Sequence, residues 1–94
     1  MKKVNLQFNL PVTILKEKKR YVAYTPALDL STSGTSYDQV KERFGEIVHI
    51  FFEELIKNNT LEKVLGDMGW VKMQKQWHSP VIISQETETL RVAV

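Results

Sequence analysis

Apolar and polar residues alternate in the first third of the chain as they do in strands. Apolar side chains occupy every even position from 4 to 14, which predicts a strand with one buried face. Pro11 lacks the N–H that a sheet needs, so this strand lies at an edge or is bulged there. The charged run 16–20 predicts a turn, residues 21–25 a returning strand, and residues 28–33 a third strand.

A long amphipathic helix is predicted next. Ser36 and Gln39 have the spacing of a capping box, and Asp38 suits the positive end of a helix dipole. Apolar residues then recur three and four positions apart, as in a helix that packs on a sheet. This stripe consists of Val40, Phe44, Ile47, Val48, Phe51 and Leu55. Because Ile50, Phe52 and Ile56 lie outside it, a partner, a second copy or the C-terminal segment could cover additional apolar surface.

The last third of the chain has a weaker pattern. Asn58 and Asn59 end the long helix, and Thr60 can cap a short second one. Residues 90–94 alternate again, which predicts a strand that completes the sheet. The expected fold class is therefore α+β in β-β-β-α order, with a short second helix and a C-terminal closing strand. One sheet carries a helix on one face, in a single domain spanning residues 1–94.

Composition narrows the function classes. The chain has 94 residues, 43% of them hydrophobic and 26% charged, with a formal net charge of +2. This balance does not favour a nucleic-acid-binding protein, which would be expected to concentrate Lys and Arg on one face. The absence of cysteine excludes disulfides and thiolate chemistry and fits a reducing cytoplasm. No apolar run approaches the roughly 20 residues that span a bilayer, so no membrane segment is expected.

Candidate catalytic chemistry is sparse. The two histidines, His49 and His78, are far apart and are expected to be exposed, and no metal-ligand spacing occurs. Glutamates on the long helix are expected to form a solvated face, with Glu53 paired to Lys57. Metal-dependent nucleases hold metal ions with strand carboxylates, and Asp29 is the only acid in the predicted sheet. We therefore expect neither an enzyme nor a cofactor.

Residues 21–36, with the sequence YVAYTPALDLSTSGTS, resemble the HicB-type antitoxin family when taken with the helix that follows to Lys57. The matching elements are a Tyr-Val-Ala-Tyr strand, a proline, a Leu-Asp-Leu strand, a glycine and a hydroxyl residue that starts the helix. The resemblance extends over residues 6–70, and the tail 71–94 matches loosely. The chain departs from the family at Asp29-Leu30-Ser31, where many members have a Pro-Gly-Cys-like turn. Many members also carry a C-terminal DNA-binding module, which is not expected here.

The resemblance implies a partial RNase H-like fold and an antitoxin that neutralises a small RNA-cleaving HicA-like toxin by direct binding and occlusion. The chain is expected to form homo-oligomers and is not expected to bind nucleic acid directly. One alternative is a stand-alone oligomeric adaptor or ligand-binding protein without a toxin. The less favoured alternative is a metal-dependent nuclease.

Five residues are candidates for these contacts. Asp29, Ser31 and Ser33 project from the predicted third strand, where a polar edge could receive a partner or simply be solvated. Trp70 and Trp77 are large enough to anchor an oligomer interface, although packing in the core or the tail would also account for them.

Overall fold

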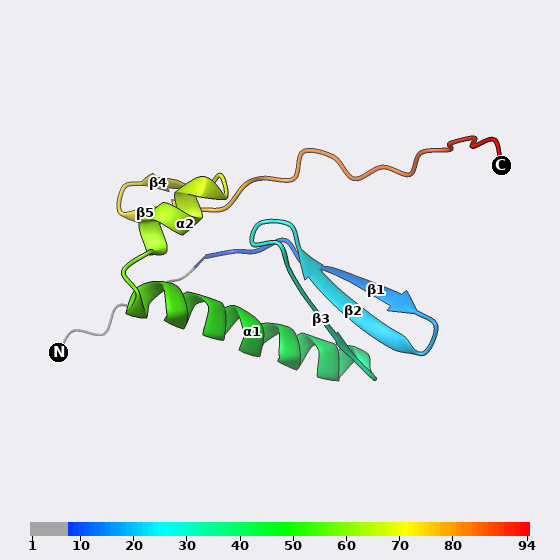
Figure 1. The fold of residues 1–94 in the computed structure, drawn as a ribbon, viewed down its shortest axis with the longest axis horizontal. Coiled ribbons are helices and arrows are strands. Elements are labelled where there is room, and N and C mark those ends of the chain that lie inside the picture. The colour runs from blue at the N-terminus through cyan, green and yellow to red at the C-terminus, as the bar shows by residue number, and fades with distance from the viewer. Residues whose placement is uncertain (1–7) are drawn as a thin grey trace.

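The structure is a computed structural model that describes residues 8–94. Three antiparallel strands form a sheet in the order β1-β2-β3, and a helix follows them. These elements are β1 (Thr13–Glu17), β2 (Arg20–Thr25), β3 (Leu30–Gly34) and α1 (Tyr37–Lys57). The rest are α2 (Leu61–Asp67), β4 (Val71–Met73) and β5 (Gln76–His78). The predicted α+β class, with a helix packed on a sheet, is confirmed (Figure 1).

The first strand is shorter than predicted. Residues 4–7 of the predicted strand lie outside the described residues, and residues 8–12 are not in a strand. Phe8 instead contacts the core, with its ring centroid 4.6 Å from that of Phe52 and 5.5 Å from that of Trp70. Because Pro11 cannot join a ladder, pairing begins only at Thr13.

The hairpin between β1 and β2 is tighter than the charged run suggested. Lys16 pairs with Tyr21 and Glu17 with Arg20, which leaves only Lys18 and Lys19 in the turn. Lys18 has a φ of 53°, the left-handed conformation that two-residue hairpin loops require.

The start of α1 follows the prediction with one change. The Ser36 side chain accepts a hydrogen bond from the Gln39 backbone N–H at 3.1 Å, as an N-cap does. The Gln39 side chain turns to Thr35, accepting from its backbone N–H at 2.6 Å and its hydroxyl at 2.9 Å. Gly34 lets this helix end approach β3, because a Cβ there would lie 2.9 Å from the Val40 nitrogen.

The core has two parts because α1 is longer than the sheet. Its N-terminal half packs on the sheet, where Ala23, Val40 and Phe44 are buried. Its C-terminal half extends beyond the sheet toward α2 and the β4–β5 hairpin (Figure 1). Phe52 was predicted to lie outside the buried stripe but is 7% exposed, because its neighbours in this second part are Phe8 and Trp70.

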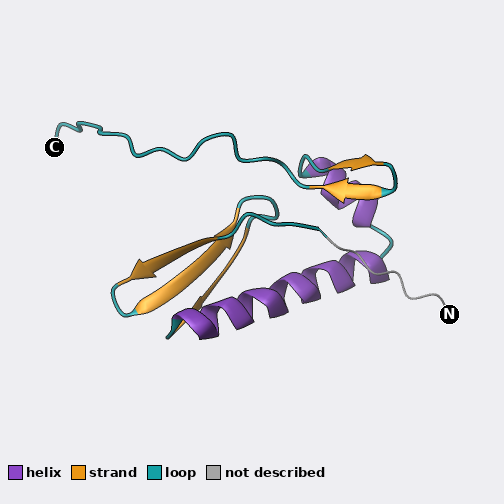
Figure 2. Ribbon diagram, turned by 180° about the vertical axis from the view of Figure 1, so that it is seen from behind, coloured by secondary structure: helices purple, strands orange, loops and turns teal. Residues whose placement is uncertain are grey.

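The C-terminal third differs most from the prediction. β4 and β5 pair only with each other, in a separate two-stranded sheet. The Thr60 side chain makes no capping hydrogen bond at the start of α2. The predicted closing strand is wrong for residues 90–94, which form no strand and whose Leu90 and Val92 are 79% and 80% exposed. These residues end a C-terminal tail that runs along the side of the molecule opposite α1 (Figure 2).

Candidate partner-binding surface

The sheet has one face covered by α1 and one face turned away from it. Residues on a strand alternate between the two faces, and Ala23 and Thr25 of β2 are fully buried beneath α1. The cross-strand register then places eight residues on the opposite face. We call it the outer face, and it consists of Thr13, Leu15, Glu17, Arg20, Val22, Tyr24, Ser31 and Ser33.

Asp29 lies at one end of the outer face. It was predicted within the third strand, but it is in the turn before β3 and has a φ of 51°. Aspartate tolerates this left-handed conformation better than most residues do. The Tyr24 hydroxyl donates a hydrogen bond to Asp29 Oδ1 over 3.2 Å, which joins the turn to the middle of the sheet.

The same contact sets the protonation of the phenol. The hydrogen bond to Asp29 raises the pKa of Tyr24 above its ordinary value of 10.0, and desolvation and the negative charge of Asp29 act in the same direction. Tyr24 is therefore a neutral hydrogen-bond donor throughout the physiological pH range.

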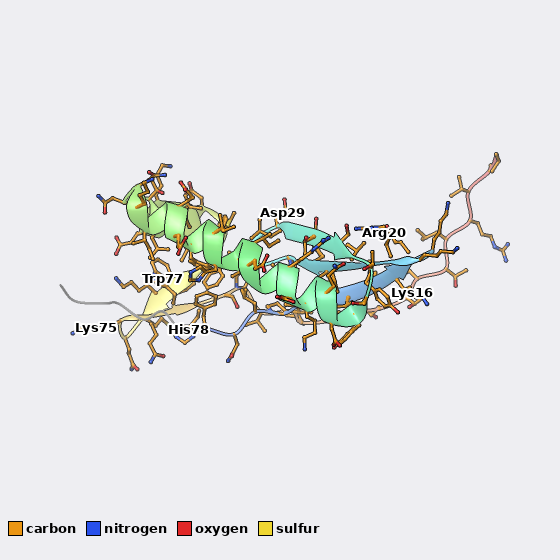
Figure 3. All side chains as sticks on the ribbon, turned by 90° about the horizontal axis from the view of Figure 1, so that it is seen from below. Lys16, Arg20, Asp29, Lys75, Trp77 and His78 are labelled. Atoms are coloured by element: carbon orange, nitrogen blue, oxygen red, sulfur yellow. The ribbon has the colours of Figure 1, made fainter. Side chains whose placement is uncertain are left out.

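Ser33 is held by two arginines. Its hydroxyl accepts a hydrogen bond from Arg20 Nη2 at 3.0 Å, and its carbonyl oxygen accepts from Arg43 Nη1 at 2.9 Å. Arg20 comes from the hairpin end of β2 and Arg43 from α1. Figure 3 shows Arg20 and Asp29 toward opposite ends of the sheet, so the outer face runs from a basic end to an acidic one.

Ser31 lies between these two ends. It is exposed and stands opposite Tyr24 on β3, one of the two edge strands of the sheet. The Ser33 carbonyl bonds to Arg43 and so points away from β2. Because this direction repeats every two residues in an antiparallel ladder, the Ser31 backbone points to the same open side. The structure thus gathers Asp29, Ser31 and Ser33 along one border of the sheet.

Three residues of this surface were missed at the sequence level. Arg20 was assigned to a solvated turn, Tyr24 only to a strand, and Arg43 to no role. The period of two could have placed Tyr24 on the same face as Val22. The contacts of the two arginines depend on the hairpin register and on the helix position, which no local pattern specifies.

The two tryptophans have different surroundings. Trp70 is 4% exposed, and its indole N–H donates a buried hydrogen bond to the Ala27 carbonyl at 2.8 Å. Trp70 therefore packs in the core, one of the two roles considered for it. Trp77 is half-buried in β5, where it packs against the core cluster, and the Lys72 ammonium lies 5.8 Å from its ring centroid.

The histidines and acids lie elsewhere. His49 Nε2 is 2.8 Å from Glu53 Oε1 on the exposed side of α1, so Glu53 pairs with His49 and not with Lys57 as predicted. His78 is exposed in β5. Within residues 8–94, no three acidic or histidine side chains form a group that could hold a metal ion. Nor does any helix there have the length and apolar character needed to cross a membrane.

No family model, curated protein or solved structure matches this chain.

Proposed function

We propose that this chain is a HicB-type antitoxin of a type II toxin-antitoxin system and that it neutralises a small RNA-cleaving, HicA-like toxin in the cytoplasm by direct binding and occlusion. Two features support the proposal. One is the resemblance of residues 21–57 to that family. The other, which carries the proposal, is the outer face bordered by an edge strand.

The outer face has the composition of a binding surface. Leu15 is 50% exposed and lies beside the half-buried Val22 and Tyr24, so an apolar strip crosses the middle of the face. Interfaces commonly combine an apolar centre with a polar rim, and here Asp29 and Arg20 stand at the two ends.

The polar groups of this face are already oriented. The bonds from Tyr24 to Asp29 and from Arg20 to Ser33 fix side chains that would otherwise lose conformational freedom on binding. Side-chain immobilisation costs about 0.5–1.5 kcal/mol per residue at an interface, so an ordered surface binds with a smaller loss. On the open side of β3, where Arg43 occupies the Ser33 carbonyl, the main-chain groups of Ser31 could pair with a partner strand.

Co-expression tests the proposal directly. The chain should restore growth of cells that express an RNA-cleaving protein encoded beside it, and that protein should co-purify with it from its own cell. Failure of both growth rescue and co-purification would rule the antitoxin function out. Recovery of only copies of this chain would favour the adaptor alternative.

The proposal includes a homo-oligomer to which Trp77 contributes. Trp77→Ala is expected to shift the oligomer mass measured by light scattering if the exposed part of the ring lies in the interface. An unchanged mass would remove Trp77 from that role.

A further inference from the structure

A groove lies along the other edge of the sheet, where β1 has no neighbour among the described strands. It has a volume of about 250 Å³ and lies between β1 and the N-terminal half of α1. Its wall is mainly apolar, and Val12 and Tyr37 in it are 41% and 50% exposed. The lining residues are Val12, Ile14, Ala23, Tyr37, Lys41 and Phe44.

The backbone of β1 is open on the same side. The Ser33 carbonyl points away from β2, toward Arg43, so Ser33 and Val22 do not exchange backbone hydrogen bonds. The N–H and C=O groups of Val22 therefore point to β1, where they face those of Leu15. Alternation then turns the N–H and C=O groups of Ile14 and Lys16 to the free edge. An added strand would therefore find donors and acceptors beside the apolar groove.

The chain itself carries an unpaired segment suited to this edge. We call residues 86–94 the C-terminal arm. Leu90, Val92 and Val94 alternate along it with Arg91 and Ala93, which is a strand pattern. These three apolar side chains are at least 79% exposed, as expected for a segment that is buried only in a complex.

The arm and β1 are complementary in an antiparallel alignment. Placing Val92 beside Val12 also places Leu90 beside Ile14, and these pairs lie on the groove side of the sheet. The same alignment brings an acid of the arm beside a base of β1, Glu88 beside Lys16.

On its own chain, the arm would have to reverse direction to reach this alignment. The Ser79 hydroxyl donates to the Asn9 carbonyl at 3.1 Å, which fixes the start of the tail beside Asn9. An extended chain from Asn9 to Lys16 spans roughly 23 Å at about 3.3 Å per residue. The nine steps from Ser79 to Glu88 reach at most roughly 32 Å, which leaves little chain for the reversal of direction that an antiparallel arm needs.

A parallel alignment that continued from the Asn9 contact would be within reach of the same chain. It would carry Leu90 and Val92 past the Lys18–Lys19 turn, where β1 has ended. Their apolar side chains would then gain no cover. The apolar and charge patterns together favour an arm from another copy.

We propose that the C-terminal arm of one copy pairs antiparallel with β1 of a second copy and fills its groove with Leu90 and Val92. Reciprocal exchange closes a two-fold dimer. The inference rests on the homo-oligomer of the proposed function and gives it a specific contact. Its tests use the purified chain alone, so their outcome is independent of whether a toxin binds.

Disulfide trapping tests the alignment without background, because the chain has no cysteine. Thr13 would stand opposite Arg91 in the exchanged dimer and beside Ile83 in the parallel alignment. Thr13→Cys with Arg91→Cys is expected to give a covalent dimer that reductant dissolves, because facing residues in antiparallel strands have the Cα separation that a disulfide needs. Thr13→Cys with Ile83→Cys should give none. No dimer from the first pair, or as much from the second, would overturn the proposal.

A charge placed in the groove tests the energetics. Val92→Asp would bury an unpaired carboxylate against Val12, so the dimer dissociation constant from sedimentation equilibrium should rise at least about tenfold. Val81→Asp is the matched control, since Val81 is 83% exposed and lies outside the arm. It should change the constant by less than about twofold. Equal effects of the two substitutions, or a wild-type chain that stays monomeric, would contradict the arm exchange.

Discussion

The two faces of the three-stranded sheet differ in how much of them is covered. The inner face is closed by α1, and its central residue Ala23 has no exposed surface. The outer face, one residue away on the same strands, keeps Leu15 and Ser31 exposed. The comparison shows that one alternating pattern produces both a folding surface and a candidate binding surface. Substitutions on the inner face should therefore change stability, and those on the outer face should change binding.

The largest expected effect is Phe44→Ala on the inner side. Phe44 is 9% exposed and packs with Ala23 and Val40. Its truncation should lower the free energy of unfolding by about 3–5 kcal/mol, as for other buried aromatics. Leu15→Ala on the outer face should change it by about 0.5 kcal/mol or less. Urea unfolding measures both, and equal losses would abolish the distinction between the faces.

Gly34→Ala should have the next largest effect. The added Cβ would lie 2.9 Å from the Val40 nitrogen, and backbone must move to relieve that contact. We expect a loss of about 1–3 kcal/mol in the free energy of unfolding. Gly45 is the control, because a Cβ there meets nothing within 4 Å. Gly45→Ala in the exposed middle of α1 should instead stabilise by about 0.5–1 kcal/mol. The two changes in melting temperature should therefore have opposite signs.

Ser36→Ala tests how the inner face is positioned by the start of α1. It removes the acceptor for the Gln39 N–H and should cost about 1 kcal/mol of unfolding free energy. Thr60→Ala is the matched control at the start of α2, where the side chain makes no capping bond. Chemical denaturation should show the smaller loss for Thr60→Ala, and the reverse order would contradict the assigned caps.

The smallest effect concerns a single proton on the outer face. Asp29→Asn should lower the pKa of Tyr24 toward 10.0, because the carboxylate that raises it is replaced by a neutral amide. A pKa raised by folding contributes stability that is fully present below 10.0 and is lost as pH rises through the folded value. Ultraviolet titration should show the ionisation of Tyr24 at a higher pH in the wild type than in Asp29→Asn. The same ionisation should be absent in Tyr24→Phe, which identifies it. A transition unchanged by Asp29→Asn would contradict the contact.

Local patterns predicted the parts of the fold that depend on neighbouring residues. The spacing of Ser36 and Gln39 placed the start of α1, and the period of three and four placed Val40, Phe44 and Leu55 on its buried side. The pattern at Asp29 and Ser31 predicted an exposed polar border, although it extended the strand too far toward Asp29. In these cases the physical cause lies within a few residues of its effect.

The failures concern contacts between distant parts of the chain. Phe52 is buried because Phe8 and Trp70 reach it from both ends of the sequence. Leu90 has a strand pattern but no strand neighbour, since alternation gives the faces of a strand and not the identity of its partner. The bond from Arg43 to Ser33 likewise depends on where α1 lies on the sheet.

The most direct measurement for the central proposal adds this chain to the proposed HicA-like toxin and follows the inhibition of RNA cleavage. Wild-type chain is expected to stop cleavage near a one-to-one ratio of chain to toxin. The control variant Glu46→Arg, on the exposed side of α1, is expected to do the same. The outer-face variant Leu15→Glu with Ser31→Arg should retain its unfolding midpoint and fail to inhibit. Full inhibition by that variant, or none by the wild type, would contradict the claim that the outer face occludes a toxin.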